Sequence, residues 1–132
     1  MRLIKFANSQ HEKFYNLMLQ KCCNNDSYHK AFFYTATISS DSRNHIDDLF
    51  NFAEDCIRIN GLYKDWQTSG TLKQTRLAFN LWNGWTENEN EKLSSAGELF
   101  DCEYSNYFVE AIRLRYPEYY RNEQHRTLDT ER

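Results

Sequence analysis

Chain breakers are scarce in this sequence: its 132 residues include one proline and four glycines. Because proline and glycine are the residues that most strongly interrupt regular structure, their scarcity favours long helices over many short strands. The length fits one domain that can bury an apolar core without a disulfide or metal staple. The sequence therefore predicts a mostly α, compact five-helix single domain over residues 1–120, in which Leu3–Phe6 is the candidate for a minor short β element.

Local patterns predict where helices start and stop. Ser9 followed by Glu12, and Thr71 followed by Gln74, match the capping box. In that motif the first side chain and the one three positions later each bond the other residue's backbone N–H. A glycine just after the last turn is a common helix end, so Asn83–Gly84 is expected to close the fourth predicted helix.

Apolar residues at helical spacing define the buried faces of two further predicted helices. The second predicted helix buries the face formed by Tyr28, Ala31, Phe32 and Thr35. The third has the clearest apolar stripe, formed by Ile46, Leu49, Phe50, Ala53 and Ile57. The last predicted helix ends near Tyr116, because Pro117 follows it. Residues 121–132, in which Leu128 is the one apolar residue, are expected to be a disordered tail.

The fourth predicted helix has two contrasting faces. The face expected to be buried carries Ala78, Leu81, Trp82 and Trp85. The face expected to be exposed carries Lys73, Arg76, Asn80 and Asn83. Region 58–85 holds all three tryptophans and four cations against Asp65, in a chain whose formal net charge is −3. A negatively charged partner would meet this region first.

We therefore predict that a partner binds the polar stripe formed by Lys73, Arg76, Asn80 and Asn83. The next candidate surface is the aromatic segment with Tyr116, Tyr119 and Tyr120. Residues 87–103 carry six carboxylates against Lys92, which leaves two interpretations open. The acidic and basic regions either guide a partner protein or pair with each other on the surface, where ion pairs contribute little.

The motifs of common enzymes are missing from the sequence. It has no nucleophile elbow, no phosphate-binding loop and no dinucleotide fingerprint, which favours a protein without enzymatic activity. A catalytic Cys–His pair could still assemble in three dimensions. A structural zinc site usually brings ligand pairs two to four residues apart. The cysteines and histidines do not form such a pair, so we predict no metal and no cofactor; the cysteines are Cys22, Cys23, Cys56 and Cys102.

No apolar run approaches the roughly 18 residues that a membrane-spanning helix needs. The first residues turn polar after Phe6 and lack the apolar stretch of a signal peptide. We therefore expect a soluble cytoplasmic protein with reduced thiols and no membrane partner. The oligomeric state is left open.

Three segments carry a resemblance to a known family: Trp66–Thr68, Arg76–Gly84 and Arg115–Tyr119. Together they resemble a family of small uncharacterised proteins from Firmicutes chromosomes and their mobile elements, catalogued as a domain of unknown function. The resemblance extends from about His11 to Tyr120. It implies a bacterial source, such as a phage or an integrative element, and it supplies no activity and no catalytic residue.

These observations favour a non-enzymatic interaction protein with a protein partner. The resemblance makes an inhibitor or adaptor acting on a bacterial host complex the preferred hypothesis, for example one of anti-defence or anti-CRISPR type. The alternative is a nucleic-acid-binding accessory protein that uses the basic, Trp-rich region 58–85, because cations beside aromatic rings suit single strands and phosphates. A third hypothesis is a small enzyme with an assembled Cys–His site.

Overall fold

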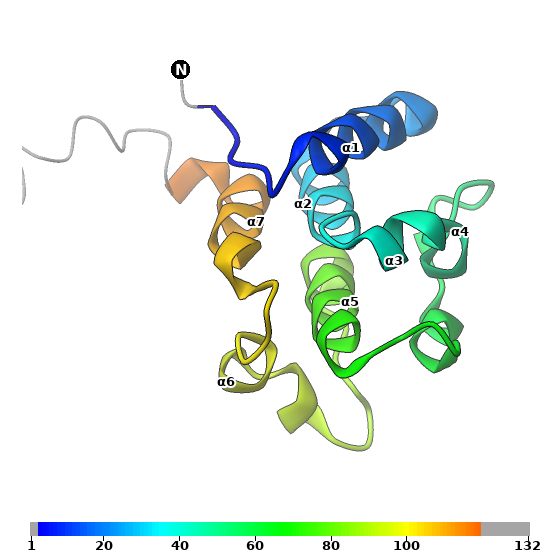
Figure 1. The fold of residues 1–132 in the computed structure, drawn as a ribbon, viewed down its shortest axis with the longest axis vertical. Coiled ribbons are helices and arrows are strands. Elements are labelled where there is room, and N and C mark those ends of the chain that lie inside the picture. Colours follow the sequence, from blue (N-terminus) through cyan, green and yellow to red (C-terminus); the bar gives the residue numbers. More distant parts are fainter. Residues whose placement is uncertain (1–2, 120–132) are drawn as a thin grey trace, which may run out of the picture.

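The computed structural model describes residues 3–119, which are mostly helical (Figure 1). The four longest helices are α1 (Ser9–Cys22), α2 (Ser27–Ala36), α5 (Ser69–Asn83) and α7 (Phe108–Arg115). Short helices are α3 (Ser40–Asn44), α4 (Ile46–Leu49) and α6 (Ala96–Leu99), and 3-10 turns lie at Ile59–Tyr63, Glu91–Ser94, Ser105–Tyr107 and Pro117–Tyr119. Strands β1 (Phe50–Asn51) and β2 (Cys56–Ile57) form an antiparallel pair. The predicted mostly α class with a minor β element is confirmed. The predicted tail, 121–132, lies outside the described residues.

Helix α2 is the centre of the core. It packs against α5, α7 and α1, and Figure 1 shows it between α1 and α5, with α7 beside it. Every residue from Ala31 to Ala36 is buried, so the C-terminal part of the helix is enclosed on all sides rather than on one face. Its Thr35 hydroxyl donates to the Ala31 carbonyl inside the same helix, at 2.8 Å. This bond lets a polar side chain sit in the core without an unpaired group.

The predicted third helix is wrong. Only Ile46–Leu49 is helical, and the chain then forms a hairpin in which Phe50 pairs with Ile57. The Asn51 side-chain oxygen accepts the Glu54 backbone N–H at 3.0 Å, a local bond that competes with helix formation. The next residue, Asp55, takes a left-handed conformation with φ 56°. The predicted strand candidate at the N-terminus is wrong as well, since the β element lies in this hairpin.

Both predicted capping boxes are misplaced, by one residue in α1 and by three in α5. The N-cap of α1 is Asn8, whose side chain accepts the His11 backbone N–H at 2.9 Å. The N-cap of α5 is Thr68, which forms a reciprocal box with Thr71. Gln74, assigned to the box from sequence, is instead buried and donates to the Ser42 hydroxyl at 2.6 Å. The end of α5 at Asn83 is confirmed, with Gly84 left-handed at φ 80°.

The cap assignment gives a direct test on α1. Asn8→Ala should lower the free energy of unfolding by about 1 kcal/mol, because the His11 backbone N–H loses its acceptor. Ser9→Ala, one residue later, is the matched control and should change stability by less than about 0.5 kcal/mol. Urea denaturation of both variants measures the difference. If Ser9→Ala proves the more damaging substitution, the helix begins at a different cap.

Candidate functional site

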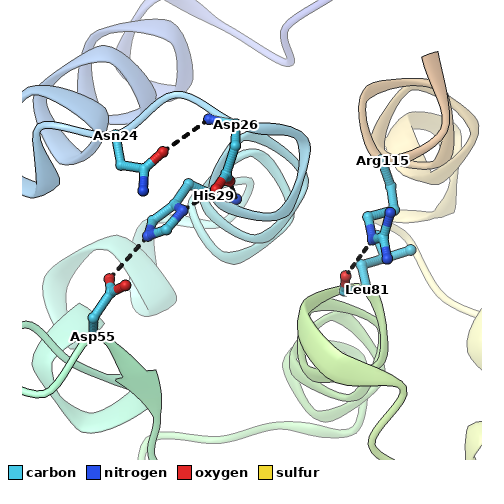
Figure 2. A network of polar contacts seen from close by, with 6 residues as sticks. All are labelled: Asn24, Asp26, His29, Asp55, Leu81 and Arg115. Carbon is cyan, nitrogen blue, oxygen red and sulfur yellow. Dashed lines mark hydrogen bonds and ion pairs between the residues drawn. The ribbon is translucent and has the colours of Figure 1, made fainter. Parts of the chain in front are cut away.

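A buried histidine lies between two carboxylates at the N-terminal end of α2 (Figure 2). Asp26 is the N-cap of α2 and accepts both the backbone N–H and the ring Nδ1–H of His29, at 2.9 and 2.8 Å. The other ring nitrogen, Nε2, lies 2.8 Å from Asp55 Oδ1. We call Cys22, Asp26, His29 and Asp55 the His29 cluster. Its histidine is fixed at both ring nitrogens by residues from different segments.

The residues of the His29 cluster come from three separate segments of the chain. Cys22 is the last residue of α1, and His29 lies in the first turn of α2. Asp55 comes from the β1–β2 hairpin, where its left-handed backbone, which aspartate tolerates better than most residues, sets the tight turn. The Cys22 sulfur, a ring nitrogen of His29 and a carboxylate oxygen of Asp55 lie within 4.8 Å of one another. Packing against Trp82, whose ring centroid is 4.8 Å from that of the imidazole, helps to keep His29 buried.

The electrostatics of the cluster favour a protonated histidine and a protonated thiol. Burial alone lowers the pKa of His29, but hydrogen bonds to Asp55 and Asp26, together with their charges, outweigh it and raise the pKa above its usual value. Burial, and secondarily the charge of Asp55, raises the pKa of Cys22 to about 11. A catalytic cysteine normally has a lowered pKa. The structure therefore brings a Cys–His pair together without activating the thiol as a nucleophile.

A second polar feature lies at the C-terminal end of α7 (Figure 2). Arg115 Nε donates to the Leu81 carbonyl of α5 at 2.9 Å. The guanidinium carbon lies 3.8 Å from the ring centroid of Tyr28 and 4.7 Å from that of Tyr116. The Tyr116 and Tyr119 rings are also neighbours, with centroids 6.4 Å apart. We call Tyr28, Arg115, Tyr116 and Tyr119 the tyrosine–arginine surface.

The tyrosines of this surface reach solvent although each contacts a neighbour. Tyr28, Tyr116 and Tyr119 are 44%, 38% and 68% exposed. Tyr116 and Tyr119 belong to the aromatic segment that the sequence marked as its second candidate, whereas Tyr120 lies outside the described residues. Tyr28 was assigned from sequence to a buried face, and its exposure corrects that prediction. The sequence did not connect it with Arg115.

The first predicted surface is less open than expected. Of its four residues only Asn83 is exposed, whereas Lys73, Arg76 and Asn80 are half-buried. Lys73 Nζ donates to the Asp101 carbonyl at 2.9 Å, and Asn80 Nδ2 donates to the Trp85 carbonyl at 3.1 Å. The expected full exposure is wrong, because these side chains tie α5 to the segment that follows it.

The basic and acidic regions pair with each other at this place. Arg76 Nε donates to Glu87 Oε1 at 3.1 Å, and Lys73 Nζ lies 3.9 Å from Asp101 Oδ2. The Asn83 side-chain oxygen accepts the Trp85 backbone N–H at 3.1 Å. Internal pairing is therefore the interpretation that fits these residues. Partner binding by the stripe stays a prediction.

On the opposite face of α5 the predicted burial is largely right. Leu81 and Ala78 are buried, and Trp82 is half-buried and packed against the core. Trp85 lies beyond the end of α5 and is likewise half-buried against the core. Both tryptophan rings meet core aromatic rings, Trp82 against Phe32 and Trp85 against Phe79. Packing with the core thus accounts for Trp82 and Trp85, two of the three tryptophans in the basic region.

The fold and these two polar features describe a small helical protein with a fixed histidine cluster and an exposed aromatic surface. The chain belongs to the family of unknown function DUF6075, whose sequence profile matches residues 1–128. This confirms the resemblance to a domain of unknown function, while the Firmicutes and mobile-element range stays a prediction. No curated protein matches the chain, and no solved structure does. Within residues 3–119 the helices are too short or too polar to cross a membrane.

Proposed function

We propose that this is a non-enzymatic interaction protein and that its tyrosine–arginine surface binds a protein partner. The observation that carries the proposal is a group of three exposed tyrosines: Tyr28 and Tyr116 lie against the fixed Arg115, and Tyr119 lies beside Tyr116. Tyrosine and arginine are enriched in the residues that dominate binding energy at protein interfaces. Tyrosine also offers a large apolar face together with a hydroxyl that stays in water.

The surface is already ordered before a partner arrives. Arg115 is held by the Leu81 carbonyl and lies against the faces of Tyr28 and Tyr116. Side chains fixed in their bound geometry lose less conformational entropy on binding, so more of the contact energy appears as affinity. This argues for recognition by a rigid patch rather than by a segment that folds on contact.

The nucleic-acid alternative has less support from the described residues. Two of the four cations in region 58–85, Lys73 and Arg76, already contact Asp101 and Glu87. A phosphate backbone is bound mainly through free cations, so internal pairing weakens this surface as a phosphate site. As the particular form of this protein binding we propose an inhibitor or adaptor role on a bacterial host complex, by analogy with small proteins of mobile elements.

Affinity capture from bacterial lysate tests the proposal. Tyr119→Ala and Tyr28→Ala should each weaken capture of the partner by about 10-fold or more, the effect of losing an interface hot spot. Tyr63→Ala is the matched control, because Tyr63 is 74% exposed and lies in the 3-10 turn after β2. It should leave capture unchanged.

Nuclease treatment separates the two functions. Capture that survives nuclease and fails with Tyr119→Ala supports a protein partner at this surface. Capture that disappears with nuclease, or that fails only when Lys73 and Arg76 are changed to Glu, contradicts the proposal and favours the basic region.

A further inference from the structure

We propose that Cys22, His29 and Asp55 bind one Zn²⁺ ion. This site goes beyond the proposed protein binding, and its test does not depend on a partner. The three side chains supply sulfur, nitrogen and oxygen, the donor atoms that proteins use for zinc. They come from the end of α1, the start of α2 and the β1–β2 hairpin, so one ion would join three segments.

The distances between the donor atoms fit a single ion that all three residues share. The three donor atoms lie within 4.8 Å of one another, and His29 Nε2 is 2.8 Å from Asp55 Oδ1. Zinc bonds of roughly 2.0–2.3 Å in tetrahedral geometry place neighbouring donor atoms about 3–4 Å apart. The three donor atoms therefore already lie close to the separations that one shared ion requires.

Asp26 is a positioning residue: it orients the His29 ring and does not bind the ion itself. It accepts the His29 Nδ1–H at 2.8 Å, which fixes the ring and leaves Nε2 facing Asp55. Histidines that bind metal almost always donate their other ring N–H in this way, often to a carboxylate. Because His29 is buried, its orientation is set before the ion arrives.

The site has an open side. The Asp55 side chain is 54% exposed, whereas the His29 side chain is 4% exposed. An ion held by three protein donors at this boundary would complete its tetrahedron with a water molecule from the Asp55 side. On binding, zinc displaces the thiol proton of Cys22 and a ring proton of His29, and both protons pass to solvent.

The competing account is a histidine ion pair that binds no metal. In that case Asp26 and Asp55 hold a protonated imidazole, and Cys22 is a neighbouring thiol without a role. The two accounts differ over the thiol. The zinc site requires the Cys22 sulfur as a ligand, whereas the ion pair of His29 with Asp26 and Asp55 does not involve the sulfur.

Cobalt is the probe, because a Co²⁺–thiolate bond gives a near-ultraviolet charge-transfer band. Reduced, chelator-treated full-length protein should bind one Co²⁺ per chain with this band, and Zn²⁺ should displace the cobalt. Cys22→Ser should abolish the band, and Asp55→Asn should weaken binding at least about 10-fold. Asp26→Asn, which keeps an N-cap, should weaken binding by about 10- to 100-fold.

A matched control shows whether the cobalt binds at Cys22 or at the exposed thiols. Cys23 and Cys56 adjoin the proposed ligands in sequence, and both are exposed. The Cys23→Ser/Cys56→Ser double variant should retain the band and the affinity. Circular dichroism checks each variant, and if Cys22→Ser fails to fold, the exposed Asp55→Asn decides the question. No band in the wild type, binding unchanged in Asp55→Asn, or loss in the double variant overturns the proposal.

Discussion

Phe32→Ala should lower the free energy of unfolding by about 3–5 kcal/mol, the cost of removing a fully buried aromatic ring and leaving a cavity. Phe32 lies in the enclosed helix α2 and has no exposed surface. Its ring meets Phe50 of the hairpin and Phe79 of α5, with centroids 5.1 and 6.4 Å away. One substitution therefore weakens the joint between three segments, and nearby side chains on α2, α5 and β1 cannot all move to fill the space.

Chemical denaturation of the purified protein measures this loss. Leu17→Ala is the control, because Leu17 is a large apolar residue on α1 that is exposed. It should cost less than about 1 kcal/mol, since little apolar area is returned to water. A Phe32→Ala variant no less stable than Leu17→Ala would mean that α2 is not the centre of the core.

Acidification should remove about 3 kcal/mol of stability through His11 alone. Its ring is fully buried and neutral: Nδ1 accepts the Ala7 backbone N–H at 3.1 Å, and Nε2–H donates to the Tyr34 carbonyl at 2.7 Å. Burial lowers the pKa of His11 to about 4, helped by the charge of Arg43, although the Tyr34 bond opposes it. A protonated Nδ1 would point its own N–H at the Ala7 N–H and could no longer accept a hydrogen bond from it.

The direction in which stability changes with pH follows from the pKa of His11 in the unfolded and in the folded protein. In the unfolded chain His11 takes up its proton near the ordinary value of 6.5, while the folded protein resists until about 4. As pH falls through this interval, the unfolded state binds more protons and is favoured, so stability is full at neutral pH and lost toward pH 4. Unfolding measured at several pH values in wild type and His11→Gln isolates the effect, because other groups titrate in both. Equal pH slopes for the two proteins would contradict it.

Local sequence signals predicted the ends of helices better than their beginnings. Gly84 follows the end of α5, and Pro117 lies two residues after the end of α7 at Arg115, close to where the sequence placed both ends. A left-handed glycine and a proline act on the backbone within a few residues. The caps were displaced because several Ser, Thr, Asn and Asp residues are adjacent at these places, and each is a competent N-cap. Asn8 and Thr68 are the residues with extended backbone whose side chains accept from the backbone N–H of His11 and of Thr71.

The hairpin was missed because its apolar residues fit two structures. Leu49, Phe50 and Ile57 have the spacing of a helical stripe, yet in the hairpin Phe50 and Ile57 are a cross-strand pair packed in or against the core. The signals against a helix were Asn51, which forms a local bond, and Asp55, which adopts a left-handed turn. Asn and Asp are also common on helix surfaces. In the sequence, the helical spacing of the apolar residues therefore counted for more than these two signals.

The His29 cluster could not be found from spacing. Cys22 and His29 are separated by a helix end and a turn, and Asp55 lies a further 26 residues along the chain. Among the proposed ligands Cys22, His29 and Asp55, no two lie two to four residues apart, so a rule based on that spacing does not find them. For the polar stripe on α5, the sequence predicted more exposure than the structure has. The residues do lie on one face of the helix, but the acidic segment that contacts Lys73 and Arg76 follows later in the chain.

The enclosure of α2 sets the order in which this chain can become stable. The helix is complete at Ala36, whereas two of the helices that cover it begin only at Ser69 and Phe108. Contacts between such distant segments require large loops to close before any energy is gained, which slows folding. On the ribosome, an apolar segment made early must wait for one made late. Synthesis from the N-terminus therefore leaves the apolar residues of α2 partly uncovered until α5 and α7 have been made.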